Sequence, residues 1–153
     1  MKTLEQWFTE YGASHQNKTN QRIHKVAVPG IYFSIVGLVW CLPSFRFSGV
    51  DIEWLWLILM PVLFFYYGLS RKVFTIMSVF TLACVIGIEV LFQLGINILN
   101  LSIGLFIILW VLQFIGHKIE GKKPSFFEDL QFLLIGPAWV FAFFIPLSDS
   151  KLT

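Results

Sequence analysis

Apolar residues gather in five long runs along the chain, with short polar segments between them. The runs lie near residues 26–44, 51–69, 73–95, 98–115 and 130–147. Each run is close to the ~20 residues that an α-helix needs to cross the hydrocarbon core of a bilayer. The pattern therefore predicts an all-α integral membrane protein, a compact bundle of four to five transmembrane helices with a polar N-terminal helical segment.

The fifth run leaves the number of spans open, because it is short and contains proline. Pro137, preceded by Gly136, lies inside the run, where proline removes a backbone hydrogen-bond donor and kinks a helix. Irregular backbone at membrane depth is tolerated only where protein or a water-filled cavity covers it. We therefore expect either a fifth span or a bent, re-entrant segment buried against protein.

The composition supports a membrane protein and argues against a nucleic-acid-binding one. Of the 153 residues, 57% are hydrophobic and 13% are charged, whereas roughly 25% are charged in an average soluble domain. The net charge is +2, and no basic stretch is interleaved with aromatic residues. No repeat, linker or low-complexity tract divides the chain, so residues 1–153 are interpreted as a single membrane domain. Cys41 and Cys84 lie in separate apolar runs and are interpreted as buried and reduced.

The distribution of basic residues predicts the orientation in the membrane. Residues 1–25 are polar and lack the early apolar region of a signal peptide, so we expect them to form a cytoplasmic segment. Short cytoplasmic loops accumulate Lys and Arg. With the N-terminus inside, the cytoplasmic basic residues are Lys2, Lys18, Arg22, Lys25, Arg71, Lys72, Lys118, Lys122 and Lys123. Only Arg46 and Lys151 then lie outside. The brevity of the chain favours a bacterial inner membrane, with the endoplasmic reticulum as the alternative.

The histidines all lie outside the apolar runs or at their ends, on the side assigned to the cytoplasm. Imidazole is the commonest metal ligand among side chains. Gln113, His117 and Glu120 have the spacing i, i+4, i+7, which places them on one face of a helix. Gly121 and Pro124 predict that this helix ends directly after Glu120.

His15 and His24 can share a metal only if the helix breaks between them. Nine residues apart on one helix, they would point in roughly opposite directions. Residues 16–20 contain Asn and Thr, which favour a turn and a new helix N-terminus. Two short helices would then direct both imidazoles inward, where part of a metal site would lie in the N-terminal segment. For each single histidine, a hydrogen-bonding role near the membrane interface is the alternative.

Other polar residues have weaker claims to a chemical role. Lys122 and Lys123 are interpreted as ordinary loop charge rather than as a carboxylate site. Glu89, Gln93 and Asn97 follow one another at four-residue steps and form a polar stripe. Hydrogen bonding between helices is favoured for this stripe over a proton or ion path. The tryptophans are interpreted as packing and interfacial residues.

Two blocks of the sequence resemble the 2-hydroxy-fatty-acid dioxygenase family. Residues 11–24 read YGASHQNKTNQRIH and are similar to the family's opening YxxxHxxxxNxxxH. Residues 113–124 read QFIGHKIEGKKP, and LLIGP follows at 133–137, similar to the family's QxxGHxxExxxP and LLxGP segments. The resemblance covers nearly the whole chain, and two ordered blocks of several residues are far more specific than one short motif. One departure is Ser125, where the family usually has Ala.

The resemblance implies a membrane-embedded, Fe(II)-dependent enzyme that uses O2 to shorten a long-chain 2-hydroxy fatty acid by one carbon. The metal ligands that it implies are His15, His24 and His117. The further site residues that it implies, for catalysis or for support of the ligands, are Glu120, Gln113, Tyr11 and Asn20.

The expected chemistry suits these residue types. Three histidines leave positions on Fe(II) for substrate and O2. The 2-hydroxyl and carboxylate of the substrate would chelate the metal, with Glu120 as a fourth ligand or as the base for the hydroxyl. Gln113 and Asn20 would orient the ligands, and the acyl tail would lie among the apolar helices.

Two other classes of function stay open at this point. A metal-dependent membrane lipid hydrolase would use the same ligands to activate water. A non-enzymatic lipid-binding protein would need no metal. Transport is disfavoured, since inverted-repeat halves are not evident. The expected partners are therefore a 2-hydroxy fatty acid, O2 and membrane lipid, with the oligomeric state left open.

Overall fold

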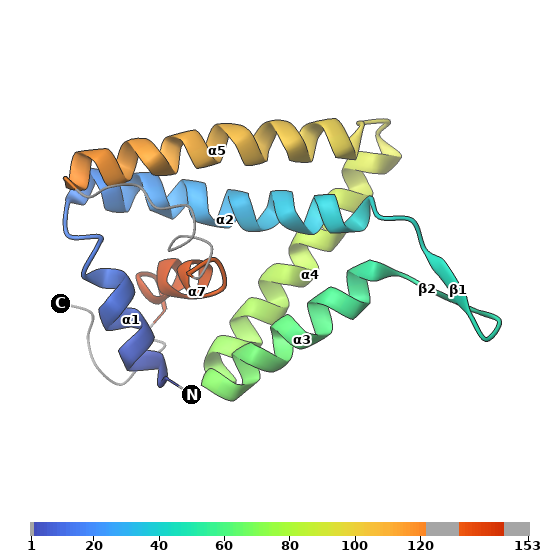
Figure 1. The fold of residues 1–153 in the computed structure, drawn as a ribbon, viewed down its shortest axis with the longest axis horizontal. Coiled ribbons are helices and arrows are strands. Elements are labelled where there is room, and N and C mark those ends of the chain that lie inside the picture. The colour runs from blue at the N-terminus through green and yellow to red at the C-terminus, as the bar shows by residue number, and fades with distance from the viewer. Residues whose placement is uncertain (1, 122–131, 146–153) are drawn as a thin grey trace. The chain divides into compact units, whose positions relative to one another are not determined.

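The computed structural model describes residues 2–121 and 132–145 (Figure 1). The elements, in chain order, are α1 (Leu4–Gly12), α2 (Lys18–Trp40), β1 (Phe45–Phe47), β2 (Val50–Ile52), α3 (Trp54–Leu69), α4 (Arg71–Gln93), α5 (Ile98–Glu120) and α7 (Ile135–Ala142). This mostly helical chain confirms the predicted fold class. The chain divides into a first unit, Met1–Tyr32 with Ile107–Thr153, and a second unit, Phe33–Phe106.

Within residues 2–121 and 132–145, three helices are long and apolar enough to cross a membrane, which is consistent with membrane association. They are α2, α4 and α5, with 23 residues each. At 1.5 Å per residue, 23 residues extend about 34 Å, enough for a hydrocarbon core of about 30 Å. The fourth apolar helix, α3, has 16 residues and extends about 24 Å.

The fifth apolar run is not a spanning helix in the part of the chain that the structure describes. Its helix, α7, has 8 residues, which extend only about 12 Å. All six residues of Ile135–Val140 are buried. Pro137 lies in the first turn of α7, where backbone N–H groups have no partner within the helix, so the proline is tolerated there. Of the two expectations for this run, a span or a bent, re-entrant segment buried against protein, the burial agrees with the second; the re-entrant course stays a prediction.

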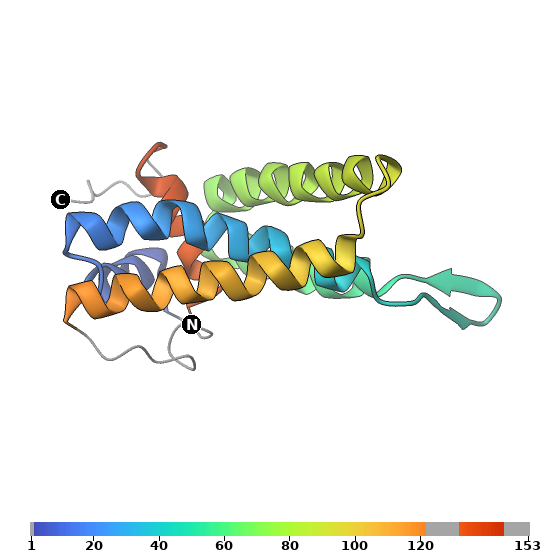
Figure 2. The same cartoon turned by 90° about the horizontal axis from the view of Figure 1, so that it is seen from above.

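The first unit contains α1, the beginning of α2, the end of α5 and α7 (Figures 1 and 2). A capping box starts α1: the Thr3 hydroxyl accepts from the Gln6 backbone N–H, and the Gln6 side chain accepts from the Thr3 N–H. Phe8 and Tyr11 are buried on the face of α1 that packs against α7. The short N-terminal helix is therefore held by its cap and by apolar burial.

The second unit contains a helical hairpin, α3 and α4, whose helices pack against each other. Ser70 separates them and caps α4 by accepting from the Lys72 backbone N–H. Beyond α4, Gly95 has a φ of +81°, the left-handed conformation that glycine adopts without strain. This turn leads the chain into α5.

The polar stripe that the sequence predicted along one helix is interrupted. The helix α4 ends at Gln93, and Asn97 instead caps α5 by accepting from the Asn100 backbone N–H. Gln93 Nε2 donates to Glu89 Oε1 at 3.0 Å within α4. The hydrogen bond between Gln93 and Glu89 therefore lies within one helix, whereas the prediction favoured hydrogen bonds between helices.

Candidate metal centre

A turn separates α1 from α2 (Figure 1). His15 lies in this turn, and His24 lies in α2. The predicted helix break between the two histidines is thus confirmed. Asn17 caps α2, because its Oδ1 accepts from the backbone N–H of Thr19 at 2.8 Å and of Asn20 at 3.4 Å. With this cap, α2 begins well before the apolar run and brings His24 into the spanning helix itself.

His15, His24 and His117 meet in the interior of the first unit. Their ring centroids lie 4.3 Å (His15–His24), 5.4 Å (His15–His117) and 5.0 Å (His24–His117) apart. One ligand atom of each ring lies within 4.8 Å of the others. Exposed fractions are 1%, 0% and 5%. The structure therefore brings together, from three separate elements, the three residues that the sequence predicted as ligands.

Backbone carbonyls orient two of these rings. Nδ1 of His15 lies 2.6 Å from the backbone carbonyl oxygen of Tyr11, and Nδ1 of His24 lies 3.0 Å from the backbone carbonyl oxygen of Asn20. Because a carbonyl oxygen only accepts, Nδ1 is the donor in both pairs and Nε2 carries the lone pair. Nε2 of His24 is buried and has no hydrogen-bond partner among the described residues. Metal-binding histidines are typically held in this way, with one nitrogen on a carbonyl and the other presented to the metal.

Glu120 ties the end of α5 to the turn between α1 and α2. Its Oε1 accepts from the backbone N–H of Gln16 at 2.7 Å and of Asn17 at 3.1 Å. Its Oε2 accepts from the Asn17 N–H and from Asn20 Nδ2, both at 2.9 Å. We call this set of contacts the Glu120 clamp. It fixes the turn that separates His15 from His24 against the helix that carries His117.

Gly116 allows α2 to approach α5 closely beside the histidines. A Cβ at this position would collide with Asn20 Oδ1 and would lie 3.2 Å from His24 Cε1. Real Cβ atoms essentially never lie as close to another atom as the Asn20 contact requires, and the His24 contact would be unusually tight, so a larger residue would displace the Asn20 side chain and press on His24. Glycine is needed here because it has no side chain and lets the two helices approach closely. Its backbone conformation is not the reason, since its φ is not in the left-handed region.

Aromatic rings cover one side of the cluster. Tyr11 stacks on His15 with centroids 4.2 Å apart and an angle of 13° between the planes. Trp139 lies 5.0 Å from Tyr11 and 5.4 Å from His15, and it is buried. The sequence interpretation assigned the tryptophans to packing and membrane belts and missed this position. Only the LLIGP block hinted at it, since α7 begins within that block, at Ile135, and carries Trp139 two residues after the block ends.

Gln113 lies on the same helix as His117 and lines a small cavity of about 10 Å³. Tyr11 and Gly136 line the cavity too, together with apolar residues. The Gln113 side chain is buried, and its Oε1 has no hydrogen-bond partner among the described residues. A buried acceptor of this kind costs free energy unless something else satisfies it. A cavity of this size has room for about one water-sized group, which would satisfy the Gln113 acceptor.

The end of α5 agrees with the sequence prediction. The helix stops at Glu120, and Gly121 follows with a φ of +76°. The predicted loop positions Lys122, Lys123, Pro124 and Ser125 lie outside the described residues.

These observations define a class: a helical protein with apolar, membrane-length helices and a buried trio of histidines from three elements. Comparison with family models gives a match to the 2-hydroxy-palmitic acid dioxygenase Mpo1-like family over residues 1–146, and the chain belongs to that family. The resemblance noted in the two sequence blocks is thereby confirmed. The family name indicates dioxygenase activity on a 2-hydroxy fatty acid. No curated protein and no solved structure matches the chain.

Proposed function

We propose that the protein is an Fe(II)-dependent dioxygenase that cleaves a long-chain 2-hydroxy fatty acid to the fatty acid one carbon shorter. The observation that carries the proposal is the buried trio His15, His24 and His117, in which backbone carbonyls set the first two rings. Membership of the family supports the reaction class and the type of substrate.

The residues of the trio fit a transition metal. Neutral imidazole is a good ligand for Fe, Zn, Cu and Ni, so the nitrogen donors suit iron without selecting it alone. When bound, Fe(II) would supply a Lewis acid for the substrate oxygens and the redox chemistry with O2. The buried lone pair on His24 Nε2 supports this fit, since a metal ion would satisfy it.

The remaining site residues bind, orient and exclude water in this proposal. Asn20 holds His24 through its backbone oxygen, and its side chain reaches Glu120. Gln113 Oε1 would accept a hydrogen bond from the 2-hydroxyl of the substrate. Tyr11 shields one face of His15 from water. We assign Glu120 a positioning role, which its accepted hydrogen bonds support; the roles of fourth ligand and base stay predictions.

The proposed reaction balances without a further reductant. The bond between C1 and C2 breaks, C2 becomes the carboxyl carbon of the shorter acid, and C1 leaves as CO2. O2 takes up four electrons, all from the substrate, and one water forms with the two hydrogens that the shorter acid does not keep. Because substrate and O2 account for all atoms and electrons, the residues need only bind, orient and move protons.

The helices suggest where the acyl tail lies and why the enzyme belongs in a membrane. The three membrane-length helices present many exposed apolar side chains, which suit lipid and a long hydrocarbon chain. We place the polar site at the cytoplasmic face, because the positive-inside rule assigns residues 1–25 and the end of α5 to that side. An integral membrane enzyme of this kind takes its substrate from the bilayer.

The test is turnover by protein purified without oxygen in detergent. Fe(II), O2 and a long-chain 2-hydroxy fatty acid are added, and products are read by mass spectrometry. We expect the acid one carbon shorter only when metal and oxygen are both present, and none from His117→Ala. The same fatty acid without its 2-hydroxyl is the matched substrate control and should stay unchanged. Turnover of a lipid ester with zinc and without oxygen would instead indicate a hydrolase, and no metal binding at all would indicate a lipid-binding protein.

A further inference from the structure

The β-hairpin in the second unit has two chemically different faces. Its strands pair antiparallel, with Phe45 opposite Ile52, Arg46 opposite Asp51, and Phe47 opposite Val50. Because neighbouring residues of a strand point to opposite faces, the two outer pairs lie on one face and the Arg46–Asp51 pair on the other. One face is thus wholly apolar and the other is charged. We call Phe45, Phe47, Val50 and Ile52 the apolar hairpin face.

The apolar hairpin face is open, whereas the charges opposite are paired. Phe47 is 66% exposed and Val50 is 63% exposed. On the other face, Arg46 Nε and Nη2 donate to the two Asp51 oxygens at 2.8 and 3.0 Å. The pair neutralises both charges and lowers the pKa of the Asp51 carboxyl through the guanidinium hydrogen bonds. A two-faced hairpin of this kind suits a boundary between an apolar phase and water.

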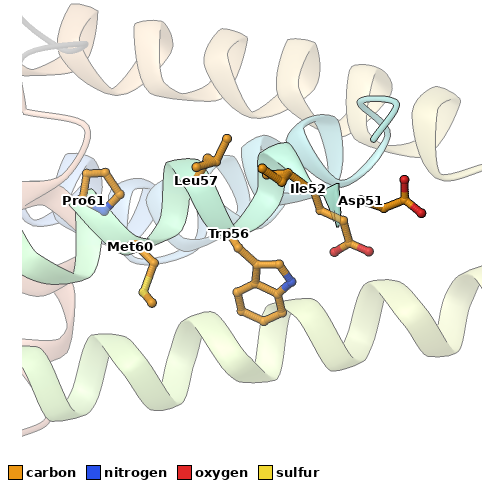
Figure 3. A pocket seen from close by; sticks show the side chains of 7 residues that line it. Asp51, Ile52, Trp56, Leu57, Met60 and Pro61 are labelled. Carbon is orange, nitrogen blue, oxygen red and sulfur yellow. The ribbon is translucent and has the colours of Figure 1, made fainter. Parts of the chain in front are cut away.

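The surface continues from the hairpin onto α3. Phe45 contacts Trp54 with ring centroids 5.1 Å apart, and Trp54 is the first residue of α3. Trp56 and Met60 follow one helical turn apart, both exposed, and line a groove of about 470 Å³ that reaches back to Asp51 (Figure 3). Aromatic residues beside exposed aliphatic ones are typical of the level where lipid headgroups meet hydrocarbon.

The neighbouring elements decide which partner fits this surface. The hairpin joins the end of the membrane-length helix α2 to the beginning of the apolar helix α3. A connection between two apolar helices of this kind lies at a bilayer boundary. We infer that the apolar hairpin face, with Trp54 and Trp56, lies in the headgroup region of the bilayer and binds membrane lipid, while the Arg46–Asp51 pair faces water. The partner is lipid rather than a second copy of the chain, because the surface is continuous with the exposed apolar side of α3.

The test places a small environment-sensitive fluorophore on each face of the hairpin. Cys41→Ser and Cys84→Ala remove the native thiols, and single cysteines are then introduced as Phe47→Cys or Val50→Cys. The matched control is Arg46→Cys, one residue away on the charged face. Its ion pair with Asp51 is exposed, and exposed pairs contribute little to stability. Each labelled protein is placed in phosphatidylcholine vesicles with a nitroxide on the lipid, or with iodide in the water.

We expect lipid nitroxide to quench the labels at positions 47 and 50 several-fold more strongly than the label at 46, and iodide to show the reverse order. Equal quenching of all three labels by iodide would overturn the inference, because the hairpin would then stand in water. Labels at 47 and 50 that neither quencher reaches would also overturn it, because protein would then cover the face. The labelled proteins should keep the helical circular dichroism spectrum of the unlabelled protein, a control that does not depend on the proposed metal site.

Discussion

Replacement of Glu120 by glutamine tests whether the Glu120 clamp holds the histidine trio together. The substitution keeps the shape of the side chain but turns one acceptor oxygen into an NH2 group. The carboxylate now accepts hydrogen bonds from the backbone N–H groups of Gln16 and Asn17 and from Asn20 Nδ2. An NH2 group in its place would face one or more of these donors with a donor of its own. We therefore expect the turn that carries His15 to loosen from α5.

The magnitude follows from which donors water can reach. Gln16 and Asn17 are exposed, so water replaces much of what their N–H groups lose. Asn20 is fully buried, and an unsatisfied buried donor costs about 1–3 kcal/mol. We expect a loss of that size in the free energy of unfolding. Groups that orient metal ligands typically change metal affinity by about 10–100-fold when they are mutated, and we expect a loss in this range.

The assay is denaturant unfolding in detergent micelles, followed by tryptophan fluorescence, together with titration by Fe(II) under argon. Glu10→Gln is the matched control, because it makes the same chemical change in α1 at a residue whose ion pair with Lys2 is exposed on both sides. Such a surface pair contributes little, so stability and metal affinity should stay close to those of the parent protein.

Two results would refute this reasoning. If Glu120→Gln and Glu10→Gln behaved alike in both measurements, the clamp would contribute nothing to the site. If Glu120→Gln and Asn20→Ala gave strictly additive losses of stability, the two side chains would not act as a pair, since contacting residues normally show coupling of about 0.5–3 kcal/mol.

Three further predictions test the site and its supports. Gly116→Ala should lower metal affinity, because the new Cβ pushes against Asn20 and His24. Gly104→Ala is the control in the same helix: its Cβ meets nothing within 4 Å, so metal affinity should not change. Equal effects of the two substitutions would contradict the argument. Asn17→Ala removes the α2 cap and should lower the free energy of unfolding by about 1 kcal/mol, with faster hydrogen exchange at the Thr19 amide; an unchanged exchange rate would be inconsistent with the cap. Tyr11→Ala should lower the free energy of unfolding by about 3–5 kcal/mol, because a buried ring is lost. Tyr11→Phe should keep the stacking on His15 and most of the metal affinity. Equal loss of metal affinity in both variants would show that the hydroxyl, not the ring, matters.

Local signals in the sequence predicted much of the fold. Apolar run lengths predicted the helical membrane class, and residues 16–20 and Gly121 marked helix ends that the structure confirms, with Asn17 as the cap. The grouping of the three histidines was predictable too, because a broken helix could turn His15 and His24 inward and the i, i+4, i+7 spacing placed His117 beside Glu120. Each of these features depends on residues close together in the chain.

The features that the sequence did not predict depend on distant contacts. Glu120 accepts from residues more than 100 positions earlier, so no local spacing signals the clamp. Gly116 matters only because Asn20 packs against it, and Trp139 only because α7 returns to α1. The length of α7 was also open, because an apolar run with an internal Gly-Pro pair is compatible with a span or with a short buried helix.

The measurement that tests the central claim most directly is electron paramagnetic resonance of the Fe(II) protein with nitric oxide as a spectroscopic probe. The protein is prepared with natural histidine and with ¹⁵N-labelled histidine, so that only nitrogens of His15, His24 and His117 differ between samples. We predict one iron per chain and nitrogen couplings that change on labelling, with one set lost in each single His→Ala variant. Bound iron whose couplings are the same in both samples, or a chain that binds no iron, would contradict the proposed metal centre.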